Sequence, residues 1–419
     1  MQGAANEKQP VVYTAQTSSP IVNGETKTTI GKDSFIVAAL FDVAEIMFVD
    51  VNSIESVNYD IVVRTDDGDL IFSRMGQWAQ PFHDSLCSSY NKAMLRAFFV
   101  SGEPLVTVKG DYSYVEDGKE ASGKAFASVY DDCVALLPPN SLARRIPLCF
   151  VSGIEKKEFE ITLKVNSCSG DGHDTYTFSK LGHGTDAFAN AIEKQIRALQ
   201  ERTLHLLKEV DPSLTTMQLS KLIKMMPNGT AAPLGDIASA ASSFKAAADE
   251  KLTKGRAGDS YNVFKELCTP DKVWVGFRKS ENEKTSAAAA PMNTPDGATD
   301  TPENEKQDNL CWMIAPSPDE RSMTVEFAEA DTATFVYRTD GNISRSAAML
   351  NRSLEAIKFK REVIRLTDEE LLLPENADYR MAAKFTSSLR FIRSNFAGRV
   401  IHSNPNAWKQ RLTEIWKGA

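Results

Sequence analysis

The sequence has few of the side chains that catalysis and metal binding use. It contains only 5 histidines in 419 residues, and none of its 6 cysteines forms a CxxC pair. The phosphate-loop motifs GxxxxGK[ST] and GxGxxG are absent, as are the zinc motif HExxH and the hydrolase motif GxSxG. We therefore expect no cofactor, and the sequence identifies no catalytic residues.

Excess basic charge and long apolar runs are also missing. With 48 Lys+Arg against 56 Asp+Glu, the net charge is −8, which argues against a nucleic-acid partner. No apolar run approaches the ~18 residues that span a bilayer, and the first residues lack a secretory pattern. Cysteines within apolar runs such as "DDCVALL" indicate buried thiols in a reducing compartment. We expect a cytoplasmic protein without a transmembrane segment, and peripheral association with a membrane is the alternative location.

What the sequence does contain is strand-like runs followed by helix-like stretches. Within residues 11–75, β-branched and aromatic runs predict short strands, and Asp67-Gly68 predicts a tight hairpin turn. After them, apolar residues recur at every fourth position from Phe82 to Phe98, the spacing of an amphipathic helix.

A second segment repeats this order. "LIFSRMG" (70–76) and "YTFSKLG" (176–182) both end a strand-like run, and a phenylalanine follows each glycine by six residues. At an offset of 100, apolar positions such as Ile46 and Ile146, or Ile61 and Ile161, coincide. After the hairpin the offset becomes 106, and the extra residues fall in the turn "NSCSGDGHD". The pattern predicts one β-then-helix module present twice.

The strand meander, the DG turn and the "FS(R/K)(M/L)G" exit into a helix resemble the pleckstrin-homology-like (PH-like) superfold, in particular bacterial PH-like and GRAM-like modules. The resemblance covers about residues 11–208 and implies an α+β fold: tandem, partly open antiparallel β-barrels, each capped by a C-terminal helix. The predicted divisions are PH-like modules 11–99 and 103–208, a helical insert 209–269, a third, degenerate sheet-plus-helix unit 270–358 interrupted by a disordered linker 279–309, and a helical tail 359–419.

Two groups of residues are candidate sites. Lipid-binding PH-like domains resemble one another in a basic loop between the first strands, and Arg144 and Arg145 are the only bases near such a position. Cys168, His173 and His183 surround the inserted turn, where Asp171 or Asp174 could complete a zinc site. Their spacing is wider than in structural zinc sites, so a polar turn is the favoured interpretation.

We expect a non-enzymatic, multi-module binding or scaffolding protein with protein partners, in a cytoplasmic or membrane-associated complex. PH-like folds leave a sheet edge beside the capping helix, where a peptide can add as a strand. One alternative is a peripheral protein that binds anionic lipids. Another is an enzyme of unknown type, with a site between the helical insert and the third unit.

Overall fold

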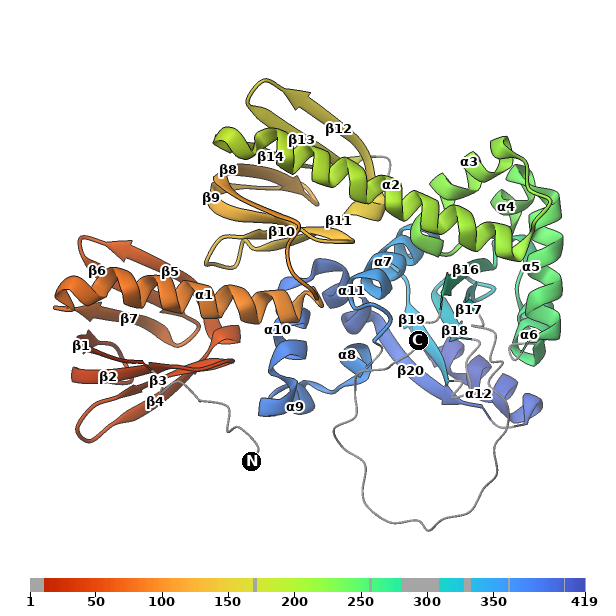
Figure 1. Ribbon diagram of the computed structural model, residues 1–419. Helices are drawn as coiled ribbons and strands as arrows, with labels where there is room; N and C mark the ends of the chain where they lie inside the picture. The colour runs from red at the N-terminus through yellow and green to blue at the C-terminus, as the bar shows by residue number, and fades with distance from the viewer. Residues whose placement is uncertain are drawn as a thin grey trace, which may run out of the picture. The chain divides into compact units, whose positions relative to one another are not determined.

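The computed structural model has a mixed α+β fold of antiparallel sheets, as the sequence predicts (Figure 1). It describes residues 11–168, 172–255, 258–279, 309–327, 333–360, 362–402 and 404–418. The chain forms two compact units. Unit 1 comprises Met1–Arg197 and Ala348–Ser394, and unit 2 comprises Ala198–Ala347 and Asn395–Ala419. Most of the predicted linker, residues 280–308, lies outside the described residues.

Unit 1 contains two seven-stranded sheets. The strands of the first are β1 (Val12–Ser18), β2 (Gly24–Ile30), β3 (Ser34–Ala38), β4 (Val43–Met47), β5 (Val51–Val57), β6 (Asp60–Thr65) and β7 (Gly68–Ser73). Those of the second are β8 (Val106–Glu116), β9 (Lys119–Val129), β10 (Cys133–Leu137), β11 (Arg144–Pro147), β12 (Val151–Lys157), β13 (Glu160–Asn166) and β14 (His173–Ser179).

Both sheets have the same strand order. It is β4-β3-β2-β1-β7-β6-β5 in the first sheet and β11-β10-β9-β8-β14-β13-β12 in the second. The register also agrees, because Ile54 pairs with Val63 as Ile154 pairs with Leu163. Each sheet has an irregularity at the start of its fifth strand, after Val51 and after Val151. The offset of 100 in the sequence therefore relates residues at equivalent positions.

A helix follows the last strand of each sheet and buries an apolar stripe. Helix α1 (Ala79–Ala97) buries Phe82 and Tyr90, and the ring of Phe82 lies 5.1 Å from that of Phe72. Helix α2 (Thr185–Val210) has the equivalent Phe188 in its first turn, and the ring of Phe188 lies 5.3 Å from that of Phe178. The predicted helical stripe is confirmed. A hairpin turn is present near Asp67-Gly68, but Thr65 pairs with Gly68, so its two central residues are Asp66 and Asp67, and Gly68 (φ +120°) begins β7.

Glycine allows the chain to turn from the last strand into each helix. Gly76 has φ +55° and Gly182 has φ +60°, in the left-handed region that side chains with a Cβ rarely adopt. The residues Arg74 and Lys180 share this conformation, at φ 56° and 55°. The exit motif thus serves the backbone geometry of the fold.

Helical segments from the C-terminal third of the chain complete unit 1. They are the end of α7 (Ile343–Ala356), then α8 (Glu362–Arg365), α9 (Asp368–Leu371), α10 (Ala377–Phe385) and all but the last residue of α11 (Ser387–Asn395). On the first sheet, Arg380 of α10 donates to Asp50 at 2.6 Å and Lys384 donates to Asp66 at 2.9 Å. Segments more than 300 positions apart in the sequence are thereby joined.

Unit 2 is built on a six-stranded sheet in the order β15-β16-β17-β18-β19-β20. The strands are β15 (Ala232–Pro233), β16 (Trp274–Lys279), β17 (Asn309–Pro316), β18 (Ser322–Phe327), β19 (Ala333–Arg338) and β20 (Phe396–Ile401). Its helices include α3 (Thr216–Met225), α4 (Leu234–Ala240), α5 (Ser242–Lys254), α6 (Gly258–Leu267) and α12 (Pro405–Gly418).

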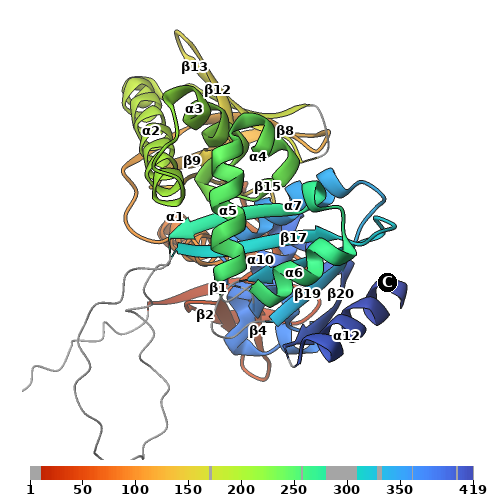
Figure 2. The same ribbon diagram turned by 90° about the vertical axis from the view of Figure 1, so that its right-hand side faces the viewer.

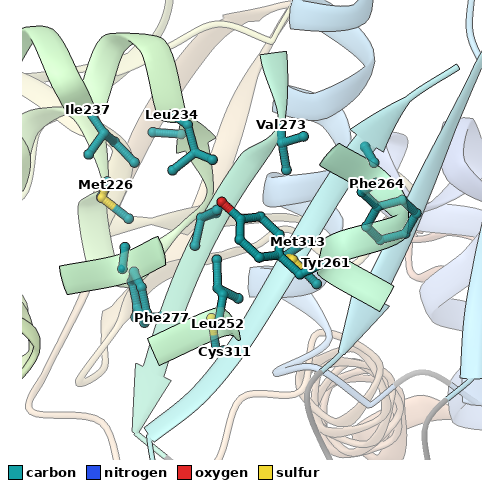
Figure 3. Close-up of a cluster of buried hydrophobic side chains, with 14 of the residues drawn as sticks. Met226, Leu234, Ile237, Leu252, Tyr261, Phe264, Val273, Phe277, Cys311 and Met313 are labelled. Atoms are coloured by element: carbon teal, nitrogen blue, oxygen red, sulfur yellow. The ribbon is translucent and has the colours of Figure 1, made fainter. Parts of the chain in front are cut away.

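Helices α4, α5, α6 and α12 cover one face of this sheet (Figure 2). Between them lies a core in which Phe264 and Leu252 meet Val273, Phe277 and Met313 (Figure 3). Within the predicted insert 209–269 lie α3–α6 and the short strand β15, and the apolar faces of these helices supply much of this core.

The prediction of an entirely helical tail over 359–419 is wrong. Residues Phe396–Ile401 form β20, which pairs with β19 from Ala333↔Ile401 to Tyr337↔Phe396. The predicted long helix before it divides into α10 and α11. Without β20, strand β19 would be the edge of the sheet and its outer backbone N–H and C=O groups would be unpaired. Pairing with these groups stabilises residues 396–401 as an extended strand. The sheet therefore takes strands from beyond the predicted unit 270–358 at both ends.

Candidate functional site: a charged cavity in unit 1

Unit 1 contains a cavity of about 130 Å³ at one end of its second sheet. The β8–β9 turn, β11 and β14 form one side, and the end of α7 and the α10–α11 junction form the other. Nine charged side chains line it: Lys119, Arg144, Arg145, Arg352 and Arg390 against Glu116, Asp117, Asp174 and Glu355.

Arg144 is held on the wall of this cavity by one carboxylate and by backbone groups. Its Nε donates to Glu116 at 2.6 Å, and its Nη1 donates to the carbonyls of Ser141 and Ala143. Its guanidinium also lies 5.0 Å from the ring centre of Tyr114. Glu116 accepts a further bond from the hydroxyl of Tyr176 at 2.8 Å. These contacts leave Arg144 little freedom to turn toward a ligand.

Arg145 forms a buried ion pair with Glu355 of α7. Its two terminal nitrogens donate to the two oxygens of Glu355 at 2.7 and 2.8 Å, and both side chains are only 4% exposed. A second carboxylate, Asp132, accepts from Arg145 at 3.1 Å. The two parallel hydrogen bonds offset the cost of removing the charges of Arg145 and Glu355 from water. The pair fastens α7 to β11.

Three cations of the cavity lack a carboxylate partner among the described residues. Arg352 is half-buried, donates to the carbonyl of Asn166, and lies over the ring of Phe150 at 4.2 Å. Lys119 and Arg390 are exposed, and no ion pair involves either within the described ranges. These three side chains come from the β8–β9 turn, α7 and α11.

Burial sets the protonation state of several groups in the wall. It raises the pKa of the Cys168 thiol, and, together with Glu116, raises the pKa of the Tyr176 hydroxyl well above its usual range. Burial also raises the pKa of Asp174, although the N–H of Asp117 opposes this. The thiol and the phenol therefore remain neutral at physiological pH.

The candidate residues from the sequence have different environments. Arg144 and Arg145 line the cavity, but both already bind carboxylates, so they do not form a free basic loop. Cys168 lies at the cavity, whereas His173 contacts the hydroxyl of Ser152 at 3.3 Å. His183 lies in the short turn before α2, and Asp171 lies outside the described residues. Within the described ranges, no group of three potential ligands could hold a metal ion.

Sequence reasoning missed Glu355, Arg352 and Arg390. Glu355 lies 210 positions from its partner Arg145, and nothing in the local sequence links them. The sequence signal is that "NRSLEAI" (351–357) places Arg352 and Glu355 on a predicted helix that also has an apolar stripe. A charge on the buried side of such a helix indicates a partner elsewhere in the fold.

A scan against protein-family models and a search of curated proteins give no significant match to this chain. In the part of the chain that the structure describes, no helix has the length and apolar character to cross a membrane.

Proposed function

We propose that this protein is a non-enzymatic, multi-module binding protein of the adaptor type, and that the unit 1 cavity is its site for an acidic ligand. The shared strand order, the shared irregularity in the fifth strand and the following helix support tandem PH-like modules over 11–99 and 103–208. Folds of this kind serve many functions, so the argument for binding rests on the cavity.

The observation that carries the proposal is the balance of charge in the cavity. Arg144 and Arg145 are neutralised by Glu116 and Glu355. Of the nine charged side chains, this leaves three cations, Lys119, Arg352 and Arg390, against two carboxylates, Asp117 and Asp174. A ligand with a phosphate or carboxylate group would receive charge-assisted hydrogen bonds from these cations.

A binding role fits this wall better than a catalytic one. A nucleophile needs a lowered pKa or an adjacent base, whereas the pKa of Cys168 is raised. Glu116 and Glu355, which could serve as bases, are held by arginines at 2.6 and 2.7 Å. The guanidinium donors occupy oxygens of these carboxylates, so those oxygens are not free to accept a substrate proton.

Calorimetric titration of the full chain with pyrophosphate and with citrate tests the proposal. We expect saturable binding that weakens with added salt. The variant Lys119→Gln/Arg390→Gln should bind at least ~10-fold more weakly, since hydrogen bonds to charged groups contribute about 1.5–3 kcal/mol each. Arg411→Gln/Lys417→Gln, which removes two exposed cations of α12, is the matched control. Equal affinity in both variants, or no binding at all, would refute the assignment.

Vesicle flotation, run beside the calorimetry, distinguishes the anionic-lipid alternative from binding of a soluble ligand. Arg144 and Arg145, the arginines predicted to bind lipid, are already paired, so a lipid surface would have to compete with Glu116 and Glu355. If the protein floats with anionic vesicles but binds neither free polyanion, the lipid function replaces the soluble ligand. Loss of flotation in Arg144→Ala/Arg145→Ala would then locate the lipid site.

A further inference from the structure

The second module of unit 1 uses a hairpin to hold the first. The tip of the β10–β11 hairpin lies against the outer edge of β5, where Asn140 forms a bridge with Ser53. The N–H of Ile54 donates to the carbonyl of Pro139 at 2.9 Å, and the N–H of Ser141 donates to the carbonyl of Asn52 at 2.9 Å. The edge of β5 is thus closed by backbone bonds from a neighbouring module.

Among the described residues, the equivalent hairpin of the first module, β3–β4, makes no such contact. The pairing of Phe35 with Ile46 matches that of Val134 with Ile146, so Leu40 occupies the place of Pro139 at the hairpin tip. Pro139 is half-buried, whereas Leu40 is 84% exposed and its neighbour Phe41 is 91% exposed. Val43 on the same hairpin is 70% exposed. Three large apolar side chains in one short tip are costly to leave in water.

The edge equivalent to β5 is also open in the second module. Strand β12 pairs with β13 in the register that β5 has with β6, so the N–H of Ile154 and the carbonyl of Ser152 point to the outer edge. No hydrogen bond to these groups from outside the sheet occurs in the described residues. Ile54, under the hairpin tip, is 3% exposed, whereas Ile154 is only half-buried. The β3–β4 hairpin tip of the first module and the β12 edge of the second module are therefore both without the contact that joins the β10–β11 tip to β5.

We propose that the β3–β4 tip of one molecule docks on the β12 edge of a second copy of this chain, repeating between molecules the contact that joins the two modules within one. The register of the internal contact, with Asn140 opposite Ser53, would place the docked tip opposite residues 152–154 of the second molecule. A contact between unlike surfaces is heterologous, so it repeats head to tail, into a ring if the rotation between molecules closes and into an open chain if it does not.

The docked tip would gain two kinds of interaction. Backbone groups at the tip would complete the β12 edge, as Pro139 and Ser141 complete β5. Leu40 and Phe41 would be removed from water against the second sheet, at the positions where Pro139 and Asn140 contact β5. The interface is a single hairpin, well below the area of a standard stable complex, so we expect weak, reversible association.

Sedimentation velocity of the full chain from about 1 µM to about 1 mM, the range of weak complexes, tests the proposal. We expect species that grow beyond a dimer as the concentration rises. The tip variant Leu40→Ser/Phe41→Ser should shift the midpoint of association at least ~10-fold upward in concentration, because both side chains lose their burial. Leu372→Ser/Leu373→Ser changes two exposed leucines of unit 1 and is the matched control. Wild-type protein that stays monomeric throughout refutes the proposal.

Mixing two variants distinguishes head-to-tail docking from other contacts. Ile154→Pro removes the N–H of the β12 edge and leaves the tip intact. Alone, this variant and the tip variant should each remain largely monomeric. An equimolar mixture should form dimers that do not grow, because only one intact tip and one intact edge can meet. Absence of dimers in the mixture would refute the head-to-tail contact, and dimers of the edge variant alone would indicate tip-to-tip pairing instead. Binding of monomers to phosphatidylcholine vesicles that depends on Leu40 and Phe41 would instead identify the tip as a membrane anchor.

Discussion

The ion pair between Arg145 and Glu355 offers the most direct test of how unit 1 is held together. Replacing Glu355 by alanine removes both acceptors of the bidentate contact and leaves a guanidinium that is 4% exposed. Breaking a buried pair in this way costs about 3–5 kcal/mol. Asp132 still accepts from Arg145 at 3.1 Å, so we expect the lower end, about 3 kcal/mol.

The assay is urea unfolding of the full chain, with hydrogen exchange read peptide by peptide. Because the pair fastens α7 to β11, loss of protection should concentrate in residues 133–147 and 348–357 of unit 1. Glu369→Ala, which removes an exposed carboxylate in α9, is the control. The double variant Arg145→Met/Glu355→Leu should recover most of the loss, since a well-packed apolar pair replaces a desolvated ionic one.

The reasoning would be refuted if Glu355→Ala cost no more than the exposed control. It would also fail if the double variant were less stable than Glu355→Ala, because the loss would then come from side-chain packing. A uniform loss of protection over both units would show that the pair does not act locally.

Three single residues give further predictions. Burial raises the pKa of Asp132, but Arg145 and Lys358 outweigh burial and lower that pKa below 3.8. The contribution of Asp132 to stability is therefore present above about pH 4 and is lost as pH falls through the lower folded pKa, so Asp132→Asn should flatten the acid limb of a plot of stability against pH. Gly76→Val should cost about 1–2 kcal/mol in thermal unfolding because φ is +55°, and Gly76→Asn should cost less; equal melting temperatures for wild type and the valine variant would contradict this. Gly276→Ala would place a Cβ against the indole of Trp312, so we expect a loss of about 1–3 kcal/mol that is confined to unit 2 and that Trp312→Phe partly relieves.

Local patterns were enough to predict many elements of the two modules. The four-residue spacing after Phe82 gives α1 one apolar face, and α1 buries that face. Gly76 has a backbone conformation that few other residues adopt, so the turn into α1 could be predicted. At Asp67-Gly68 only the glycine has a positive φ, and the turn is centred one residue earlier than the dipeptide indicates. The offset of 100 likewise predicted which residues occupy equivalent places, because strand register preserves the side-chain alternation.

The charged cavity required partners that no local pattern indicates. Arg145 was visible in the sequence, but whether it binds a ligand or Glu355 depends on where α7 lies. Lys119, Arg352 and Arg390 belong to three elements, and only the packing of those elements on the second sheet makes them neighbours. The same holds for β20, whose extended form depends on the open edge of β19.

The sequence by itself determined the strand-and-helix order of the modules, the turns and the apolar faces, because these depend on residues a few positions apart. The tertiary structure alone decided which charges are neutralised, which remain available in the cavity, and which of two equivalent hairpins is covered. Those outcomes depend on contacts between segments, some of them 330 positions apart, where burial makes the cost of an unpaired charge or an exposed edge large enough to select the partner.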